Sequence, residues 1–95
     1  MLQRRSVYVC YDIAHPRRLQ RVAKATERSG LRVQQSVFVC SLNADEWLAL
    51  RQRLGALVHA EQDRLMYQPV CPLCQRRTVW QGVQPLPEHL AYWVL

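Results

Sequence analysis

The alternation of apolar and polar residues predicts four strands and two helices. The first strand covers 6–13, where β-branched, aromatic and cysteine residues precede Asp12 at its carboxyl end. A longer apolar stretch, 31–42, changes phase halfway along, which is typical of a bent strand or of two short strands. Residues 64–70 form a further strand at or near a sheet edge, because Pro69 has no N–H to donate.

Two segments between these strands have the period of amphipathic helices. The first begins near Pro16, which suits the first helical turn, and Gly30 is placed to end it in the left-handed conformation. The second begins at Asn43, which forms a capping box with Glu46, and it runs to about His59.

The element order βαββαβ predicts an α+β protein with a ferredoxin-like fold, in which two helices cover one face of a four-stranded antiparallel sheet. Residues 76–81 are a candidate for an additional strand, which either extends the sheet edge or crosses to a second subunit. A chain of 95 residues has a small core and is a natural candidate for dimerisation. We therefore expect a ferredoxin-like domain at 1–82 and a tail at 83–95 whose aromatic, apolar end docks on the dimer or on a partner.

The charge balance indicates the kind of binding partner, because a net charge of +6 favours nucleic acid or another polyanion. A basic stripe on the first helix is either a solvated surface or part of such an interface. Its residues are Arg17, Arg21, Lys24 and Arg28. The sequence shows neither an apolar run long enough for a bilayer nor a signal-peptide pattern, so we expect a cytoplasmic protein.

Four cysteines in a cytoplasmic protein are expected to be reduced thiols. Cys10 and Cys40 lie in strand-like runs and suit small buried side chains. Cys71 and Cys74 form a CxxC motif, for which the sequence leaves three interpretations open: a loop or strand-end feature, half of a zinc site, or a redox pair.

Asp12 is the only carboxylate at the end of a predicted inner strand. Mg²⁺ prefers carboxylate oxygens and commonly takes one or two of them, so a site with two would need two chains related by a two-fold axis. His15 lies three residues after Asp12 and is either a candidate general base or a turn residue with no chemical role. Arg17, Arg18 and Arg21 are placed to hold phosphates, with or without chemistry.

Three stretches resemble one known family. They read Tyr-Val-Cys-Tyr-Asp-Ile at 8–13, Arg-Val-Ala at 21–23, and Gly-Leu-Arg-Val-Gln-Gln-Ser-Val-Phe at 30–38. They resemble CRISPR-associated protein two, the ferredoxin-like partner of the integrase in spacer acquisition, over roughly residues 6–82. The resemblance implies a homodimer with facing sheets and an exchanged last strand. Some members of this family are described as metal-dependent endoribonucleases or DNA nucleases, and others as a bridge that holds duplex DNA between integrase dimers.

The resemblance also implies site residues. Asp12 matches the strand-end aspartate that meets its twin across the dimer axis, which would give one Mg²⁺ per dimer shared by both chains and the catalytic centre of a nuclease. Phe38 matches the aromatic residue of the second motif. The residues expected to bind nucleic acid are Arg17, Arg18, Arg21 and Arg32.

The sequence therefore predicts a CRISPR adaptation subunit that binds duplex DNA, or single-stranded RNA, and bridges integrase dimers. Mg²⁺-dependent phosphodiester hydrolysis stays open beside this role. The alternative is a ferredoxin-like RNA-binding or ligand-sensing module unrelated to CRISPR. Aromatic residues on the strands are scattered (Tyr8, Tyr11 and Phe38), which does not favour an RNA-recognition module.

Overall fold

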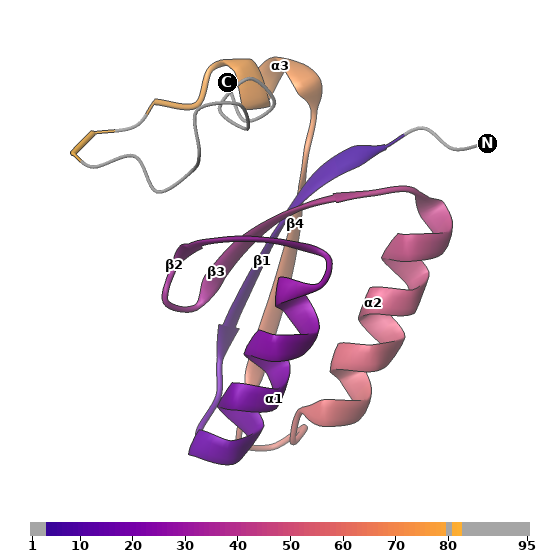
Figure 1. The fold of residues 1–95 in the computed structure, drawn as a ribbon, viewed down its shortest axis with the longest axis vertical. Helices are drawn as coiled ribbons and strands as arrows, with labels where there is room; N and C mark the ends of the chain where they lie inside the picture. Colours follow the sequence, from indigo (N-terminus) through magenta and orange to yellow (C-terminus); the bar gives the residue numbers. More distant parts are fainter. Residues whose placement is uncertain (1–3, 80, 83–95) are drawn as a thin grey trace.

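The computed structural model describes residues 4–79 and 81–82, and its architecture is the predicted α+β fold. The four strands form one antiparallel sheet in the order β2-β3-β1-β4, and the two long helices lie side by side in front of it (Figure 1). The elements, in chain order, are β1 (Arg5–Asp12), α1 (Pro16–Glu27), β2 (Gly30–Gln34), β3 (Val37–Leu42), α2 (Ala44–Leu57), β4 (Arg64–Val70) and α3 (Pro72–Arg76).

The hydrophobic core lies between the sheet and the helices. Alternate residues of a strand point to opposite faces, so Val7, Val9 and Tyr11 of β1 face the helices together with Phe38 of β3. Leu54 of α2 is fully buried against them. In α1, Val22 and Ala23 are buried against the sheet, whereas Leu19 of the same helix is 38% exposed.

The opposite face of the sheet is covered by neither long helix. Val39 of β3 is fully buried there beneath three partly buried neighbours, Tyr8, Leu31 and Val33. Met66 of β4, which pairs with a β1 residue of this same face, is 55% exposed. We call these five residues the open sheet face; it is an apolar surface, and the residues that the structure describes form a sheet layer and a helix layer.

The long apolar stretch at 31–42 forms two strands, β2 and β3, joined by a turn at Gln35 and Ser36. The turn is tied to the central strand, since the Tyr11 backbone N–H donates to the Ser36 carbonyl at 3.1 Å and the Tyr11 hydroxyl to the Gln35 carbonyl at 3.3 Å. This hairpin explains the change of phase in the sequence.

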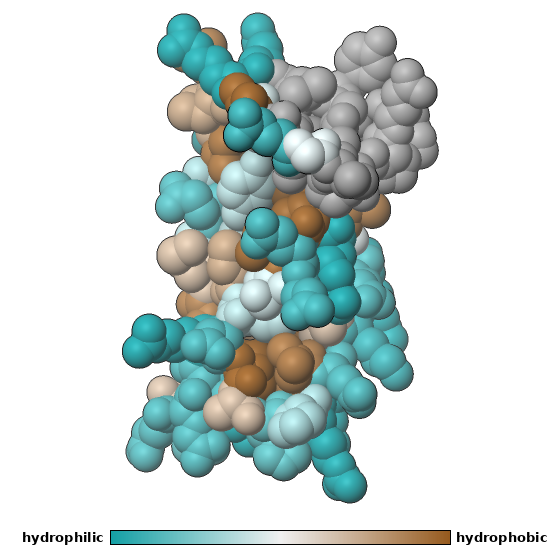
Figure 2. Space-filling model, turned by 90° about the vertical axis from the view of Figure 1, so that its left-hand side faces the viewer, coloured by the Kyte–Doolittle hydropathy of each residue, from teal (hydrophilic) through white to brown (hydrophobic). Residues whose placement is uncertain are grey.

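Figure 2 shows the side of the molecule that lies on the left in Figure 1, where apolar patches alternate with strongly polar side chains.

The role predicted for Gly30 is wrong. Helix α1 ends at Glu27, with Arg28 as its C-cap, and Gly30 lies in β2 without a positive φ. A Cβ at this position would meet the Val39 carbonyl oxygen and atoms of Cys40. Glycine is therefore needed for the close approach of β2 to β3 and not for the end of a helix.

The strand predicted at 76–81 does not extend the sheet of this chain in the described residues of that stretch. Arg76 ends α3, and 77–79 and 81 have no regular structure. The local reason is that Cys71 caps α3 and Pro72 occupies its first turn, which favours a helix. An exchanged strand would pair with a strand of a second chain, and this structure contains one chain. The exchange therefore stays a prediction. The tail at 83–95 lies outside the described residues.

The remaining boundaries agree with the sequence. Asn43 and Glu46 form the predicted capping box at the start of α2, and β4 is an edge strand, as Pro69 indicated. Among the helices of the described ranges, none has the length and apolarity that crossing a membrane requires.

Candidate nucleic-acid and metal site

Asp12 is the last residue of β1, at the foot of the central strand in Figure 1, where the chain turns toward α1. The strand period places it on the same face as Tyr8, away from the helices, and its side chain is exposed. The register of β1 and β4 puts Arg64 directly opposite. The structure therefore presents this carboxylate at one end of the open sheet face, accessible to a second chain.

A single chain does not offer a complete metal site. Within 4–79 and 81–82, no three side chains of the His, Cys, Asp or Glu type lie close enough together to hold an ion. A lone carboxylate beside an arginine is a weak Mg²⁺ ligand set, although its oxygen chemistry is the right kind. Asp12 thus fits Mg²⁺ only if a second carboxylate comes from another chain.

His15 is the N-cap of α1. Its Nδ1 accepts a hydrogen bond from the Arg17 backbone N–H at 3.1 Å, which stabilises the first turn of the helix. This structural role accounts for a histidine at this position. It leaves only Nε2 free for other contacts.

Arg18 is committed to an ion pair that the sequence did not indicate. Its guanidinium donates two hydrogen bonds to the Asp63 carboxylate, from Nε at 2.8 Å and from Nη2 at 3.1 Å. The same carboxylate, whose side chain is fully buried, accepts from the backbone N–H groups of Ala14 at 2.9 Å and His59 at 2.7 Å. The Arg18 guanidinium, followed by these backbone donors, holds the pKa of Asp63 well below its usual range.

The other three predicted arginines differ in whether their side chains already have an ion-pair partner within the described residues. Arg32 pairs with Glu27 at 3.4 Å and lies over the Phe38 ring at 5.3 Å, so it covers the core edge. Arg17 and Arg21 are exposed on α1, and neither side chain has an ion-pair partner among the described residues. Of the predicted set, these two are free to bind an anion.

The structure also forms a hollow of about 340 Å³ that is lined by arginines, which the sequence did not predict. We call it the second basic hollow, as distinct from the exposed pair Arg17 and Arg21. It lies between the end of α1 and the middle of α2, where Arg28 and Arg53 approach Arg4. Glu46 neutralises Arg4 at 2.7 Å, which leaves two arginines without an acidic partner in the part of the chain that the structure describes. Arg28 belongs to the basic stripe of α1, but no local pattern relates it to Arg53.

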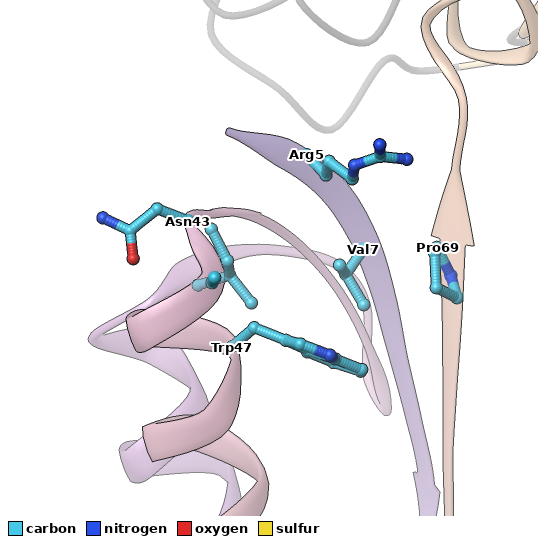
Figure 3. Close-up of a pocket in the computed structure, with 7 residues that line it drawn as sticks. Arg5, Val7, Asn43, Trp47 and Pro69 are labelled. Carbon is cyan, nitrogen blue, oxygen red and sulfur yellow. The ribbon is translucent and has the colours of Figure 1, made fainter. Parts of the chain in front are cut away.

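An apolar pocket of about 220 Å³ lies at the other end of β1 (Figure 3). Trp47 of α2 points into it, and Arg51 lies over the Trp47 ring at 4.5 Å while Tyr67 meets that ring edge-on at 5.1 Å. Because Asp12 lies at the opposite end of β1, this pocket is separate from the site described above. The lining residues are Arg5, Val7, Leu42, Asn43, Ala44, Trp47 and Pro69.

Comparison with known proteins identifies the family. A family model described as "CRISPR associated protein Cas2" matches residues 5–78, from the start of β1 to beyond α3. The chain belongs to the Cas2 family. This membership confirms the resemblance found in the sequence, and it weighs against a ferredoxin-like module unrelated to CRISPR.

Individual relatives agree with the family match. "CRISPR-associated endoribonuclease Cas2 1" of Chloroflexus aurantiacus is 37% identical over 84% of this chain and 87% of its own length. "CRISPR-associated endoribonuclease Cas2 4" of Rhodospirillum rubrum is 38% identical over 85% of this chain and 66% of its own length.

Two solved structures are similar to this Cas2 protein in three dimensions. Hypothetical protein TT1823 from Thermus thermophilus has a TM-score of 0.79 and 38% identity, over 90% of this chain and 99% of that one. Streptococcus pyogenes Cas2 has a TM-score of 0.73 and 33% identity, over 81% and 99% respectively. All of Asp12, Arg17, Arg18, Arg21 and Arg32 fall inside the segment that matches the family model.

Proposed function

We propose that this protein acts in CRISPR adaptation as a homodimer that binds duplex DNA and bridges integrase dimers. The observation that carries the proposal is the family match over 5–78, which includes the open sheet face and the exposed arginines of α1. The proposal places the protein in the cytoplasm, where its DNA and integrase partners would be.

The open sheet face supports the dimer. A small protein gains stability by covering an apolar sheet face, and a second copy of the same face satisfies two-fold symmetry. In such a dimer Asp12, at the end of that face, would approach its twin. Lysine in place of Met66 should lower the dimer fraction in sedimentation equilibrium, because it puts a charge on the contact surface.

The matched control is Leu48→Lys, since Leu48 is exposed on α2 and lies outside the open sheet face. It should leave the dimer intact. Equal dissociation by the two variants, or a wild-type protein that stays monomeric at assay concentrations, would remove this part of the proposal.

Arg17 and Arg21 support binding to a nucleic-acid backbone. They lie four residues apart on α1, so their side chains emerge from the same face with Cβ atoms about 5–6 Å apart. This arrangement suits successive phosphates of one strand, and contacts of this kind are independent of base sequence. The salt dependence of binding then reports how many phosphates are contacted.

The test compares two double variants of equal charge. Arg17→Gln with Arg21→Gln should weaken duplex binding and reduce the slope of log K against log salt by about 2 for each chain of the dimer that contacts the duplex. Arg28→Gln with Arg53→Gln removes the same charge from the second basic hollow and should leave that slope unchanged. The reverse result would move the DNA interface to the second hollow. The same fluorescence titration with single-stranded RNA decides which nucleic acid binds more tightly.

Bridging is tested by mixing the protein with the CRISPR integrase and measuring the mass of the complex by light scattering. A particle that contains more than one integrase dimer is expected. An integrase that stays a free dimer in the presence of this protein and duplex DNA would refute the bridging role.

A second function, Mg²⁺-dependent phosphodiester hydrolysis, is favoured by the position of Asp12 and by the endoribonuclease names of the relatives. Asp12 from each chain would hold one Mg²⁺ between them, and the bound ion would supply a polarised water and neutralise phosphate charge. Arg17 and Arg21 would orient the phosphate backbone beside it.

Asp12→Asn tests this function against Asp45→Asn, which removes an exposed carboxylate at the start of α2. Asp12→Asn should abolish both cleavage and the binding of one Mg²⁺ per dimer in calorimetry, while duplex binding persists. Asp45→Asn should change none of these. Cleavage that survives in the Asp12 variant would come from a contaminating nuclease.

A further inference from the structure

Cys71 and Cys74 lie together where the chain leaves β4. Cys71 is the residue between β4 and α3, and its sulfur accepts a hydrogen bond from the backbone N–H of Cys74 at 3.3 Å. Both side chains are exposed, so the pair is accessible to a reagent in solution.

These contacts make the two sulfurs unequal. The backbone N–H of Cys74, followed by its thiol, lowers the pKa of Cys71, because both hydrogen bonds stabilise the thiolate. The same thiol contact raises the pKa of Cys74. One sulfur is thus favoured as a nucleophile, and a protonated thiol lies next to it.

The other two cysteines are suited to packing alone. Cys40 is fully buried in the core, and burial raises its pKa to about 11. Burial also raises the pKa of Cys10 on β1. Reactivity toward oxidants should therefore concentrate at the exposed pair.

We propose that Cys71 and Cys74 form a reversible dithiol–disulfide couple, in which Cys71 attacks and Cys74 resolves. The oxidant is a small-molecule disulfide such as glutathione disulfide. The Cys71 thiolate attacks one of its sulfurs, forms a mixed disulfide and expels one glutathione thiolate. Cys74 then loses its proton and attacks the Cys71 sulfur, which expels the second glutathione thiolate. Two protein thiols are oxidised and one small disulfide is reduced to two thiols.

The site has a structural consequence beyond the proposed role in adaptation. The new bond would close a ring over the first turn of α3, directly after the edge strand β4. Oxidation would thereby fix the direction in which the chain leaves the sheet, whereas the reduced pair leaves α3 held only by hydrogen bonds.

The experiment equilibrates the intact protein with buffers of defined glutathione to glutathione disulfide ratio, blocks the free thiols and identifies the modified peptides by mass spectrometry. A disulfide between Cys71 and Cys74 that dithiothreitol reverses is expected. Cys10 and Cys40 should stay reduced and react only after unfolding. Cys74→Ser should trap the mixed disulfide on Cys71.

Cys71→Ser is the matched variant, because the thiol that remains, Cys74, accepts no backbone hydrogen bond among the described residues, whereas the Cys71 sulfur does. The remaining thiol should react with iodoacetamide at neutral pH at least about tenfold more slowly than Cys71 does in Cys74→Ser. Equal rates for the two variants, or oxidation only between chains, would overturn the proposal. The proposal would also be overturned if the purified protein contained stoichiometric zinc that is released when both thiols are blocked. That result would assign the pair to a metal site.

Discussion

The same substitution, glycine to alanine, should have opposite effects at two positions of this fold. At Gly30 an added Cβ would meet the Val39 carbonyl oxygen, the Cys40 Cα at 2.9 Å and the Cys40 sulfur at 2.5 Å. At Gly55, exposed in the last turn of α2, the added methyl would have no atom within 4 Å. The first position is blocked largely by backbone, and the second is open.

The magnitudes follow from these surroundings. Since Val39 and Cys40 present backbone atoms, β2 must move away from β3, and overpacking of this kind costs about 1–3 kcal/mol. Alanine at Gly55 should instead stabilise the fold by about 0.5–1 kcal/mol, because glycine is a poor helix former. For a domain of this size, these changes correspond to a melting temperature roughly 5–20 °C lower and roughly 2–8 °C higher, respectively.

The assay is urea denaturation followed by tryptophan fluorescence, with all proteins at one concentration because dimerisation would shift the midpoint. Combining Gly30→Ala with Cys40→Ala removes the sulfur but leaves the backbone contacts, so it should not restore stability. Full rescue by the double variant, or a Gly30→Ala protein as stable as wild type, would show that β2 does not approach β3 as closely as the structure indicates.

Three other measurements probe the interior. Contact with Arg18 lowers the pKa of Asp63, so the folded state binds that proton more weakly than the unfolded state. Its contribution to stability is complete above the ordinary aspartate pKa of about 4 and is lost as pH falls through the lower folded value. Asp63→Asn should therefore melt lower at neutral pH and lose less stability on acidification; a parallel pH profile would contradict this. Phe38→Ala removes a fully buried ring that stacks on Tyr11 at 6.1 Å and should cost about 3–5 kcal/mol in urea denaturation, whereas a loss below 1 kcal/mol would be inconsistent with its burial. Tyr67→Phe removes a buried hydroxyl that has no hydrogen-bond partner among the described residues, so thermal melting should show unchanged or slightly higher stability; a clear loss would reveal an unseen partner.

Local patterns predicted the elements of this fold because each element is specified by neighbouring residues. The capping box joins Asn43 and Glu46, which are three positions apart, and the proline of β4 excludes that strand from the sheet interior without reference to any other strand. The role of Gly30 was missed because it depends on β3, whose approach is a property of the assembled hairpin. A glycine after a helix is ambiguous until the following strand is placed.

The candidate site was predictable to a lesser extent for the same reason. The position of Asp12 follows from the end of a strand, which the apolar pattern marks directly. The pairing of Arg18 with Asp63 joins residues 45 positions apart and gave no local signal. A cluster of arginines in a sequence therefore does not distinguish those that are free to bind a ligand from those that hold the fold together.

That distinction has a physical consequence for Arg17 and Arg21. Asp63 ties the segment before α1 to the end of α2, through Ala14 and His59, and Arg18 fastens α1 itself to the same carboxylate. The start of α1 is therefore held in place by contacts within the chain itself. A cation on a fixed helix loses less conformational freedom on binding than one on a loose segment, so more of its attraction to phosphate remains as affinity. In the proposed DNA complex, loss of the Asp63 pairing should then weaken binding even though the Asp63 carboxylate is occupied by Arg18 and backbone donors.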